Sequence, residues 1–450
     1  MSLPPKPQRQ AERVSLWRYL RLFRRDILSA QPERLFRAWM AEFRTPFFRS
    51  YLINQPELLR TVLKDRPQDF PKSDRVSAGL RPLLGRSVFL TNGETWKRQR
   101  RIIDPAFEGG RLQVTFPAMR SAAEAAYERL SGHLGENVEV EAEMNHTAAD
   151  VIFRTLFSLP IEDATARAVF EAFRLHQRSQ PILNLGAFVP LPAWMPLGHR
   201  RATRVTARKI RALLTDLTDQ RRAQIAAGTA PDDLATKIMT TPDPVSGACF
   251  TADEMVDQVA IFFLAGHETS GAALAWALYL LATNPDWQDR VAAEAQSLCV
   301  ETVSDVAQLS VTRDVFRETL RLYPPVPMMV REAAGAEVFR QRSLRRGAQV
   351  VLSPWHLHRH ERLWETPDSF DPGRWQTDTG RTSARSAFIP FSAGPRVCPG
   401  AGFAMIEGPL VLARVLRAFR VEPVEGRVPV PQAHLTIRAR DGIWLRFVRR

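Results

Sequence analysis

The chain has 450 residues, of which 45% are apolar and 24% charged, a composition typical of a soluble globular protein. Its three cysteines, Cys249, Cys299 and Cys398, are too few and odd in number for a disulfide framework. The first ten residues are polar and proline-rich, and no apolar run reaches the ~18 residues of a membrane span. We therefore expect a cytoplasmic protein without a transmembrane segment.

Basic residues exceed acidic ones, and the formal net charge is +14. Nucleic-acid binding would require a recognisable basic module, and the sequence contains none, so we expect no nucleic-acid partner. Two interpretations remain for the charge. It reflects a compositional preference for arginine, or it forms a basic face for an acidic electron-transfer protein.

Amphipathic spacing predicts a basic helix over residues 16–27, which either packs on its own domain or makes peripheral contact with a membrane. Residues 47–53 predict a strand, and Pro56 begins a helix. Glycines and a proline predict a loop over 73–93, and helix resumes at 94–100.

Residues 115–240 have a mostly helical pattern, clearest at 124–130 and 200–226. Between them, residues 181–196 are apolar but contain helix breakers, so they cannot form one long helix. They form either a buried irregular connection or a mobile lid.

A long buried helix is predicted to begin at a capping box, Thr251 to Glu254, and to end at Thr283 before Asn284-Pro285. Its length is roughly 50 Å, the width of a domain. The polar residues 266–270 interrupt its apolar centre. They indicate either a packing glycine followed by a threonine bonded to the preceding turn, or a ligand site.

Three further elements complete the chain. Residues 312–322 predict a helix that places Glu318 and Arg321 on one face, and 403–419 predict another. Alternation in 435–438 and 443–448 predicts a hairpin around residues 440–442.

Segment 391–400 reads Phe-Ser-Ala-Gly-Pro-Arg-Val-Cys-Pro-Gly. A thiolate is a strong metal ligand, and we expect the helix that follows Cys398 to lower the pKa of its thiol. Gly394 and Gly400 let the backbone pass close to a flat ligand. A buried thiolate without a partner would be costly, so the loop implies a metal. The alternative is a buried free cysteine in a turn.

This spacing, Phe-x-x-Gly-x-Arg-x-Cys-x-Gly, resembles the haem-binding loop of the cytochrome P450 family. Four other motifs follow the family order: Trp96-x-x-x-Arg100, the Ala-Gly-His-Glu-Thr-Ser stretch at 265–270, Glu318-x-x-Arg321, and Phe-Asp-Pro-Gly-Arg at 370–374. The resemblance covers Trp96 to Gly400.

The resemblance implies a mainly α (α+β) fold, a helical bundle around a long central helix with small β-sheets. We expect a flexible N-terminus over residues 1–15 and one catalytic domain over 16–450. The implied cofactor is haem b, with Cys398 as the axial ligand of its iron. The other residues that the resemblance places at the haem are Trp96, Arg100, Arg331, Arg396, Phe391, Gly394, Gly400 and Ala265. It implies a buried structural network of Glu318, Arg321 and Arg374.

The resemblance also implies O2-dependent hydroxylation of a lipophilic substrate. Thr269 and Glu268 are expected to deliver protons, and Gly266 is expected to loosen the helix into a groove. Residues 181–196 would then be a lid over the substrate channel.

We expect electrons from NAD(P)H to arrive through separate partners, an acidic ferredoxin or flavodoxin with its reductase. The candidate docking arginines are Arg98, Arg100, Arg101 and Arg396. We expect a monomer.

Within the family, segment 388–396 is most similar to the branch that hydroxylates fatty acids and hydrocarbons, and the chain resembles the soluble bacterial type. That branch often has a glutamate where this chain has Ala265, so we do not expect covalent haem attachment. Two alternatives keep the fold: a peroxide-driven or non-oxygenating haem-thiolate enzyme (peroxygenase, isomerase or dehydratase), and a non-catalytic haem sensor or carrier.

Overall fold

The computed structural model describes residues 3–7, 16–44, 49–179 and 201–450. The helices are α1 Leu16–Arg25, α2 Pro56–Arg60, α3 Asp74–Leu84, α4 Gly93–Ile103, α5 Gly110–Ser131, α6 Val140–Phe157, α7 Ala164–Ser179, α8 Arg201–Ala226, α9 Leu234–Thr240, α10 Ala252–Ala282, α11 Pro285–Ser297, α12 Val303–Gln308, α13 Ser310–Leu322, α14 Pro354–Leu357, α15 Asp378–Ala387 and α16 Ala401–Ala418. The strands are β1 Met40–Arg44, β2 Arg49–Ile53, β3 Asn137–Glu139, β4 Met329–Glu332, β5 Glu337–Phe339, β6 Arg342–Leu344, β7 Gln349–Leu352, β8 Phe419–Pro423, β9 Pro431–Ala433, β10 Ile437–Ala439 and β11 Trp444–Arg449.

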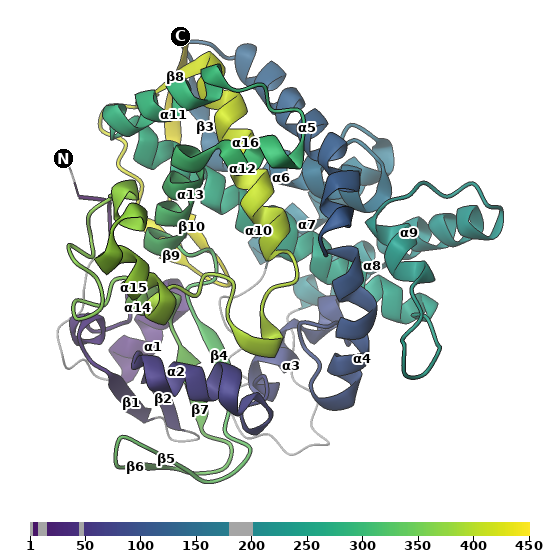
Figure 1. Cartoon of the computed structure of the whole chain (residues 1–450). Coiled ribbons are helices and arrows are strands. Elements are labelled where there is room, and N and C mark those ends of the chain that lie inside the picture. The colour runs from purple at the N-terminus through teal and green to yellow at the C-terminus, as the bar shows by residue number, and fades with distance from the viewer. Residues whose placement is uncertain (1–2, 8–15, 45–48, 180–200) are drawn as a thin grey trace.

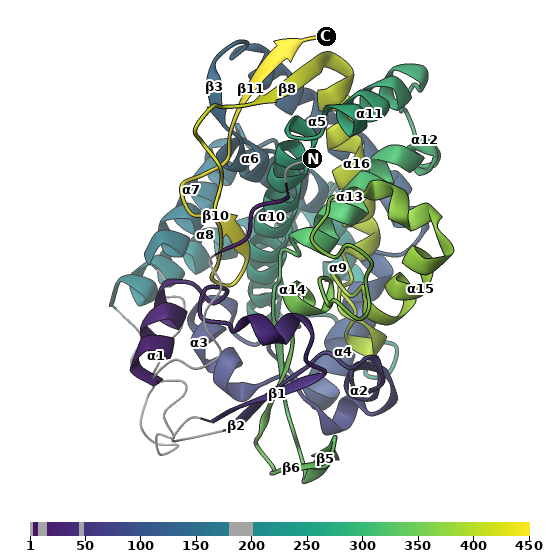
Figure 2. The ribbon, with the colours of Figure 1, turned by 90° about the vertical axis from the view of Figure 1, so that its left-hand side faces the viewer.

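Helix α10 runs through the centre of the helical part of the molecule, as Figures 1 and 2 show. The predicted capping box is confirmed, because the Thr251 side chain accepts from the Glu254 N–H and the Glu254 side chain accepts from the Thr251 N–H. The helix ends at Ala282, before Pro285 begins α11. Helices α6, α8, α13 and α16 pack around it. The mainly α fold is therefore confirmed.

A four-stranded sheet in the order β1-β2-β7-β4 lies at the lower end of the molecule in Figure 1. Strand β2 pairs parallel with β7, and the other pairs are antiparallel. Strand β4 carries Arg331, and an isolated bridge joins Arg331 to Lys72. The sheet thus brings two distant basic residues together.

The interior divides into two main apolar clusters. The helical cluster surrounds α6, α10 and α16, whereas the sheet cluster fills the space behind β2, β4 and β7. Phe388 packs against both. It lies ten residues before Cys398, so the cysteine loop begins where the two clusters meet.

The expected loop over residues 73–93 is wrong for its first half, where α3 forms. Pro82 lies in the last turn of α3 and Leu83 and Leu84 are buried. Packing of α3 on α8 and α10 supplies the stabilisation that the composition of the segment does not indicate.

The expected C-terminal hairpin is also wrong. Strand β11 pairs with β8 and β3, whereas β10 pairs with β9. The period-two pattern identified the strands, but alternation alone does not identify a strand's partner.

Of the segment 1–15, the structure describes residues 3–7, in which Pro4 and Pro7 are buried. The hydroxyl of Tyr323 donates to the Pro5 carbonyl at 2.9 Å.

The expected lid over 181–196 lies outside the described residues. Across the described helices, none combines the length and the apolar character needed to cross a bilayer.

Candidate functional site

One face of the buried helix α10 is accessible. Ala265 is exposed and Thr269 is partly exposed, although most of their neighbours on α10 are buried. The two residues are one turn apart, so they share a face. The Thr269 hydroxyl donates to the Ala265 carbonyl at 2.5 Å. Cys398 is accessible too, although it lies deep among protein atoms. Ala265, Thr269 and Cys398 therefore each present accessible surface.

The loop that carries Cys398 is held by its own backbone and by a neighbouring segment. The Cys398 N–H donates to the Phe391 carbonyl at 2.9 Å. Gly394 has a φ of 69°, and a Cβ there would lie 2.0 Å from the Leu63 carbonyl oxygen. Glycine is thus required by a backbone contact. Gly400 caps the start of α16.

The expectation of a lowered pKa for the Cys398 thiol is wrong. Burial raises its pKa, and it outweighs the hydrogen bond from the Gly400 N–H and the charge of Arg100, which both lower it. A buried thiol of this kind becomes a stable thiolate when a metal ion takes the place of the proton.

Three cations surround the buried indole of Trp96. The Lys72 ammonium lies 5.6 Å from the ring centroid, and the guanidinium carbons of Arg396 and Arg100 lie at 5.4 Å and 6.0 Å. Arg100 also donates to Asp104 and to the Val397 carbonyl, at 2.6 Å and 2.7 Å. The structure therefore brings together Trp96, Arg100 and Arg396 as the motifs predict.

The charges of this group are poorly compensated. Burial and the charges of Arg331, Arg396 and Arg100 lower the pKa of Lys72 to about 6. Burial and the charge of Arg396 lower the pKa of Arg331 to about 10. The Nε atoms of Arg331 and Arg396 are buried and have no hydrogen-bond partner within the described chain. Three arginines and a lysine converge here, and two of the arginines have spare hydrogen-bond donors. This arrangement fits the two carboxylates of a haem.

Lys72 is the member of this group that the sequence motifs missed. Its Nζ donates to the carbonyls of Val88 and Thr91, at 2.5 Å and 3.1 Å. Nothing in its local sequence indicates a ligand, because it follows Pro71 in an irregular segment. The pairing of its backbone with Arg331, and hydrogen bonds of 2.9 Å and 3.1 Å between its backbone and the Asn92 side chain, bring it to the site.

The helix is not loosened at Gly266 as we expected, because α10 is continuous from Ala252 to Ala282. A Cβ at Gly266 would lie 2.4 Å from Cδ1 of Ile152 on α6. Close packing of two helices therefore accounts for this glycine. Gly271 has the same role, against Asn145.

The Glu268 carboxylate is buried in a polar cluster. Arg438 donates to Oε1 from Nη2 and Nε at 2.5 Å and 3.1 Å, and Thr436 also donates to Oε1. Gln177 on α7 donates to Oε2 at 3.1 Å. None of these partners is Thr269. The two residues expected to share a proton relay are adjacent in sequence, but their side chains have different partners.

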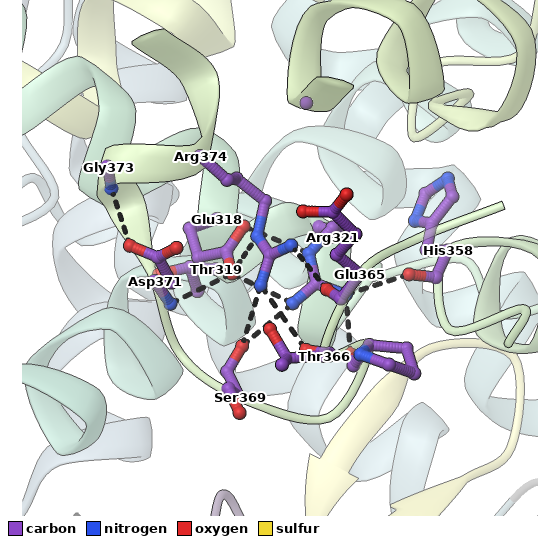
Figure 3. Close-up of polar contacts among 12 residues, drawn as sticks. Glu318, Thr319, Arg321, His358, Glu365, Thr366, Ser369, Asp371, Gly373 and Arg374 are labelled. Atoms are coloured by element: carbon purple, nitrogen blue, oxygen red, sulfur yellow. Dashed lines mark hydrogen bonds and ion pairs between the residues drawn. The ribbon is translucent and has the colours of Figure 1, made fainter. Parts of the chain in front are cut away.

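Glu318, Arg321 and Arg374 form the buried network that the motifs predict (Figure 3). Arg321 binds both oxygens of Glu318, at 2.9 Å and 2.8 Å, and Arg374 Nε donates to Oε1 at 2.9 Å. The two guanidiniums also donate to carbonyls, including that of Ser369. The network fixes the loop before Arg374 onto α13 and lies outside the cation group.

The expected docking arginines are mostly paired within the chain. Arg98 binds Glu254 at 2.6 Å, Arg101 binds Asp243 at 2.5 Å, and Arg396 donates to the carbonyls of Pro67 and Phe70. The charges of Arg98 and Arg101 are therefore compensated by carboxylates of the chain, whereas Arg396 has carbonyl partners only among the described residues.

Comparisons with known proteins agree with this geometry. The cytochrome P450 family profile matches residues 35–443. Cyclooctat-9-en-7-ol 5-monooxygenase of Streptomyces melanosporofaciens is 32% identical over 86% of this chain and 83% of its own. A cytokinin hydroxylase of Arabidopsis thaliana is 29% identical over 87% of this chain and 77% of its own.

The crystal structure of the cytochrome P450DA haem domain superposes with a TM-score of 0.81 at 25% identity, covering 99% of this chain and 98% of that one. The chain belongs to the cytochrome P450 family, and it is an oxidoreductase with the general activity of a hydroxylating monooxygenase that uses haem b and O2.

Proposed function

We propose that the protein inserts one oxygen atom of O2 into a C–H bond of a lipophilic substrate, with electrons from a separate partner. The observation that carries this proposal is that Cys398 and the face of α10 with Ala265 and Thr269 are both accessible, although most of α10 is buried. When bound there, haem supplies the activation of O2. The residues of the chain are proposed to hold the haem, to line the substrate site and to deliver protons.

Cys398 is the proposed axial ligand. Trp96, Arg100, Arg331 and Arg396, together with Lys72, hold the carboxylates of the haem. Their spare buried donors support this role, since a carboxylate satisfies them and offsets their mutual repulsion. Phe391 and Gly394 shape the cysteine loop, and Gly400 begins the helix behind it.

The substrate is proposed to be lipophilic. Ala265, on the accessible face of α10, is apolar. The name of the Streptomyces relative describes oxidation of a cyclic alkenol at its position 5. An apolar residue on the accessible face of α10 and a relative of this kind support a hydrocarbon-rich substrate.

Protons are proposed to pass through Thr269, whose hydroxyl lies on the accessible face of α10. Glu268 is the proposed acid behind it. Since Glu268 is bonded to Arg438 and Thr436, its use as a relay requires those bonds to exchange.

Electrons are proposed to come from NAD(P)H through an acidic ferredoxin or flavodoxin and its reductase. The net charge of +14 supports attraction of an acidic carrier. We propose a cytoplasmic monomer.

The test is the absorption spectrum of the reduced, carbon-monoxide-bound protein, with Cys398→Ser beside the wild type. We expect a strongly red-shifted Soret band in the wild type alone. A band at the histidine-type position in the wild type would overturn the thiolate assignment. Substrate conversion with peroxide alone, at the rate seen with a reductase, would favour the peroxygenase alternative.

A further inference from the structure

A cavity lies where α5 and α11 pack against α16, at the end of the molecule that holds the C-terminus (Figures 1 and 2). Its volume is about 520 Å³, which is within the range of small-molecule sites. The segment between α11 and α12 contributes Cys299, Val300 and Glu301 to its lining. None of the lining residues belongs to the haem site described above, so this α5–α16 cavity is a separate feature of the fold.

The bottom of the α5–α16 cavity is apolar. Ala123 of α5, Ala295 of α11 and Ala413 of α16 line it, and Leu410 adds a larger side chain. All four residues are buried by their neighbours, so they lie at the deepest part of the lining. The alanines leave space between the three helices that larger side chains would fill. An apolar part of a ligand can therefore enter between the helices.

The charged residues of the lining are three arginines and two glutamates, so the α5–α16 cavity has one positive charge in excess. Arg414 binds both oxygens of Glu124, at 2.5 Å and 2.6 Å, and its guanidinium carbon lies 3.5 Å from the centroid of the Tyr127 ring. Arg120 pairs with Glu301. Both carboxylates therefore have a partner, and the third arginine accounts for the excess charge.

That third arginine is Arg417, which is exposed. It donates to the Leu298 carbonyl at 3.1 Å and has no carboxylate partner within the described residues. A guanidinium has five N–H donors, so Arg417 can bind a carboxylate and keep this bond. Arg120 can join it, because the side chains of the Arg120–Glu301 pair are 47% and 59% exposed, and an exposed pair contributes little stability.

We propose that the α5–α16 cavity binds a small amphipathic carboxylate, with its charged group on Arg417 and its apolar part against the alanines. The planar fork of a guanidinium matches a carboxylate, and one bound anion offsets the excess charge of the cavity. An acidic protein is a poorer occupant, because a folded surface would not reach the alanines at the bottom. The proposal does not rest on the proposed function, since binding is measured without turnover.

The test uses Cys299 as a reporter, because it lines the cavity and is exposed. The full-length haem-loaded protein reacts with N-ethylmaleimide, and mass spectrometry gives the labelling rates of Cys299 and of Cys249, an exposed cysteine that does not line the cavity. We expect saturating octanoate to slow the labelling of Cys299 severalfold and to leave Cys249 unchanged. Octylammonium, which has the same chain length and the opposite charge, should not protect Cys299.

Arg417→Gln tests the residue that binds the carboxylate. We expect it to raise the octanoate concentration for half-maximal protection of Cys299 by about tenfold or more, because a charged hydrogen bond is lost. Arg420→Gln is the matched control. It changes the net charge equally at an exposed residue that does not line the cavity, and it should leave the half-maximal concentration unchanged. The reduced carbon-monoxide spectrum of each variant verifies that its fold is intact.

Three results would overturn the proposal. Octanoate that shifts the Soret band without protecting Cys299 would bind at the haem site only. Equal protection by octylammonium, or the same half-maximal concentration in Arg417→Gln and the wild type, would exclude recognition of the carboxylate. Protection of Cys299 by an acidic ferredoxin but not by octanoate would make this surface a protein-docking site instead.

Discussion

At the scale of single residues, Lys72 carries the clearest prediction at the haem site. Burial and the charges of Arg331, Arg396 and Arg100 lower its pKa to about 6, and a carboxylate bound beside it would favour its charged form. We expect Lys72→Gln to speed haem loss by about tenfold or more, since a charged hydrogen bond contributes about 1.5–3 kcal/mol. Haem transfer to excess apomyoglobin measures the rate. Lys97→Gln is the control, because Lys97 is exposed and pairs with Glu94. Equal rates in all three proteins would contradict the assignment of Lys72.

A second residue, Glu407, predicts a pH dependence of stability. It is buried on α16, accepts from Ser270 at 2.7 Å, and burial raises its pKa from 4.5 to about 8. Since the folded state holds the proton more tightly, this stabilisation is present at low pH. It is lost as the pH rises from 4.5 through about 8. We expect Glu407→Gln to remove up to a few kcal/mol of that decline in the free energy of unfolding. Urea titrations of both proteins across this range measure it, and parallel pH curves would refute the assignment.

At the scale of elements, the contact between α6 and α10 predicts the effect of Gly266→Ala. The added methyl would collide with Ile152, so we expect a loss of about 1–3 kcal/mol in the free energy of unfolding. Ile152→Ala in the same chain should recover part of that loss relative to the sum of the two single changes. If the two changes add without recovery, the packing explanation fails.

The elements also show what a sequence can predict. The bounds of α10 followed from its capping box and its proline, which are local signals. The proposed role of Cys398 and the Glu318 network came from family spacing. Lys72 and the partners of Glu268 could not be predicted, because residues distant in the chain meet there through the sheet and through β10. The pairing of β11 with β3 and β8 could not be predicted for the same reason.

At the scale of the whole molecule, the proposed haem site lies where the two apolar clusters meet. Trp96 belongs to the helical cluster, whereas Ala393 of the cysteine loop packs on the sheet cluster. Arg331 comes from β4 of the sheet, and Lys72 is bridged to it. A haem held by these residues would contact both clusters at once, so its binding should couple their unfolding.

We therefore expect calorimetry to distinguish the haem-loaded from the haem-free protein. The loaded protein should unfold in one cooperative transition at a higher temperature, because a ligand that binds only the folded state stabilises it by mass action. Without haem, the uncompensated cations repel one another at the junction of the clusters, and the sheet part should unfold first. Lys72→Gln should reduce the difference in unfolding temperature between the haem-loaded and haem-free forms, since it weakens haem binding. If both forms unfold at the same temperature with the same shape of transition, the haem site does not hold the two clusters together.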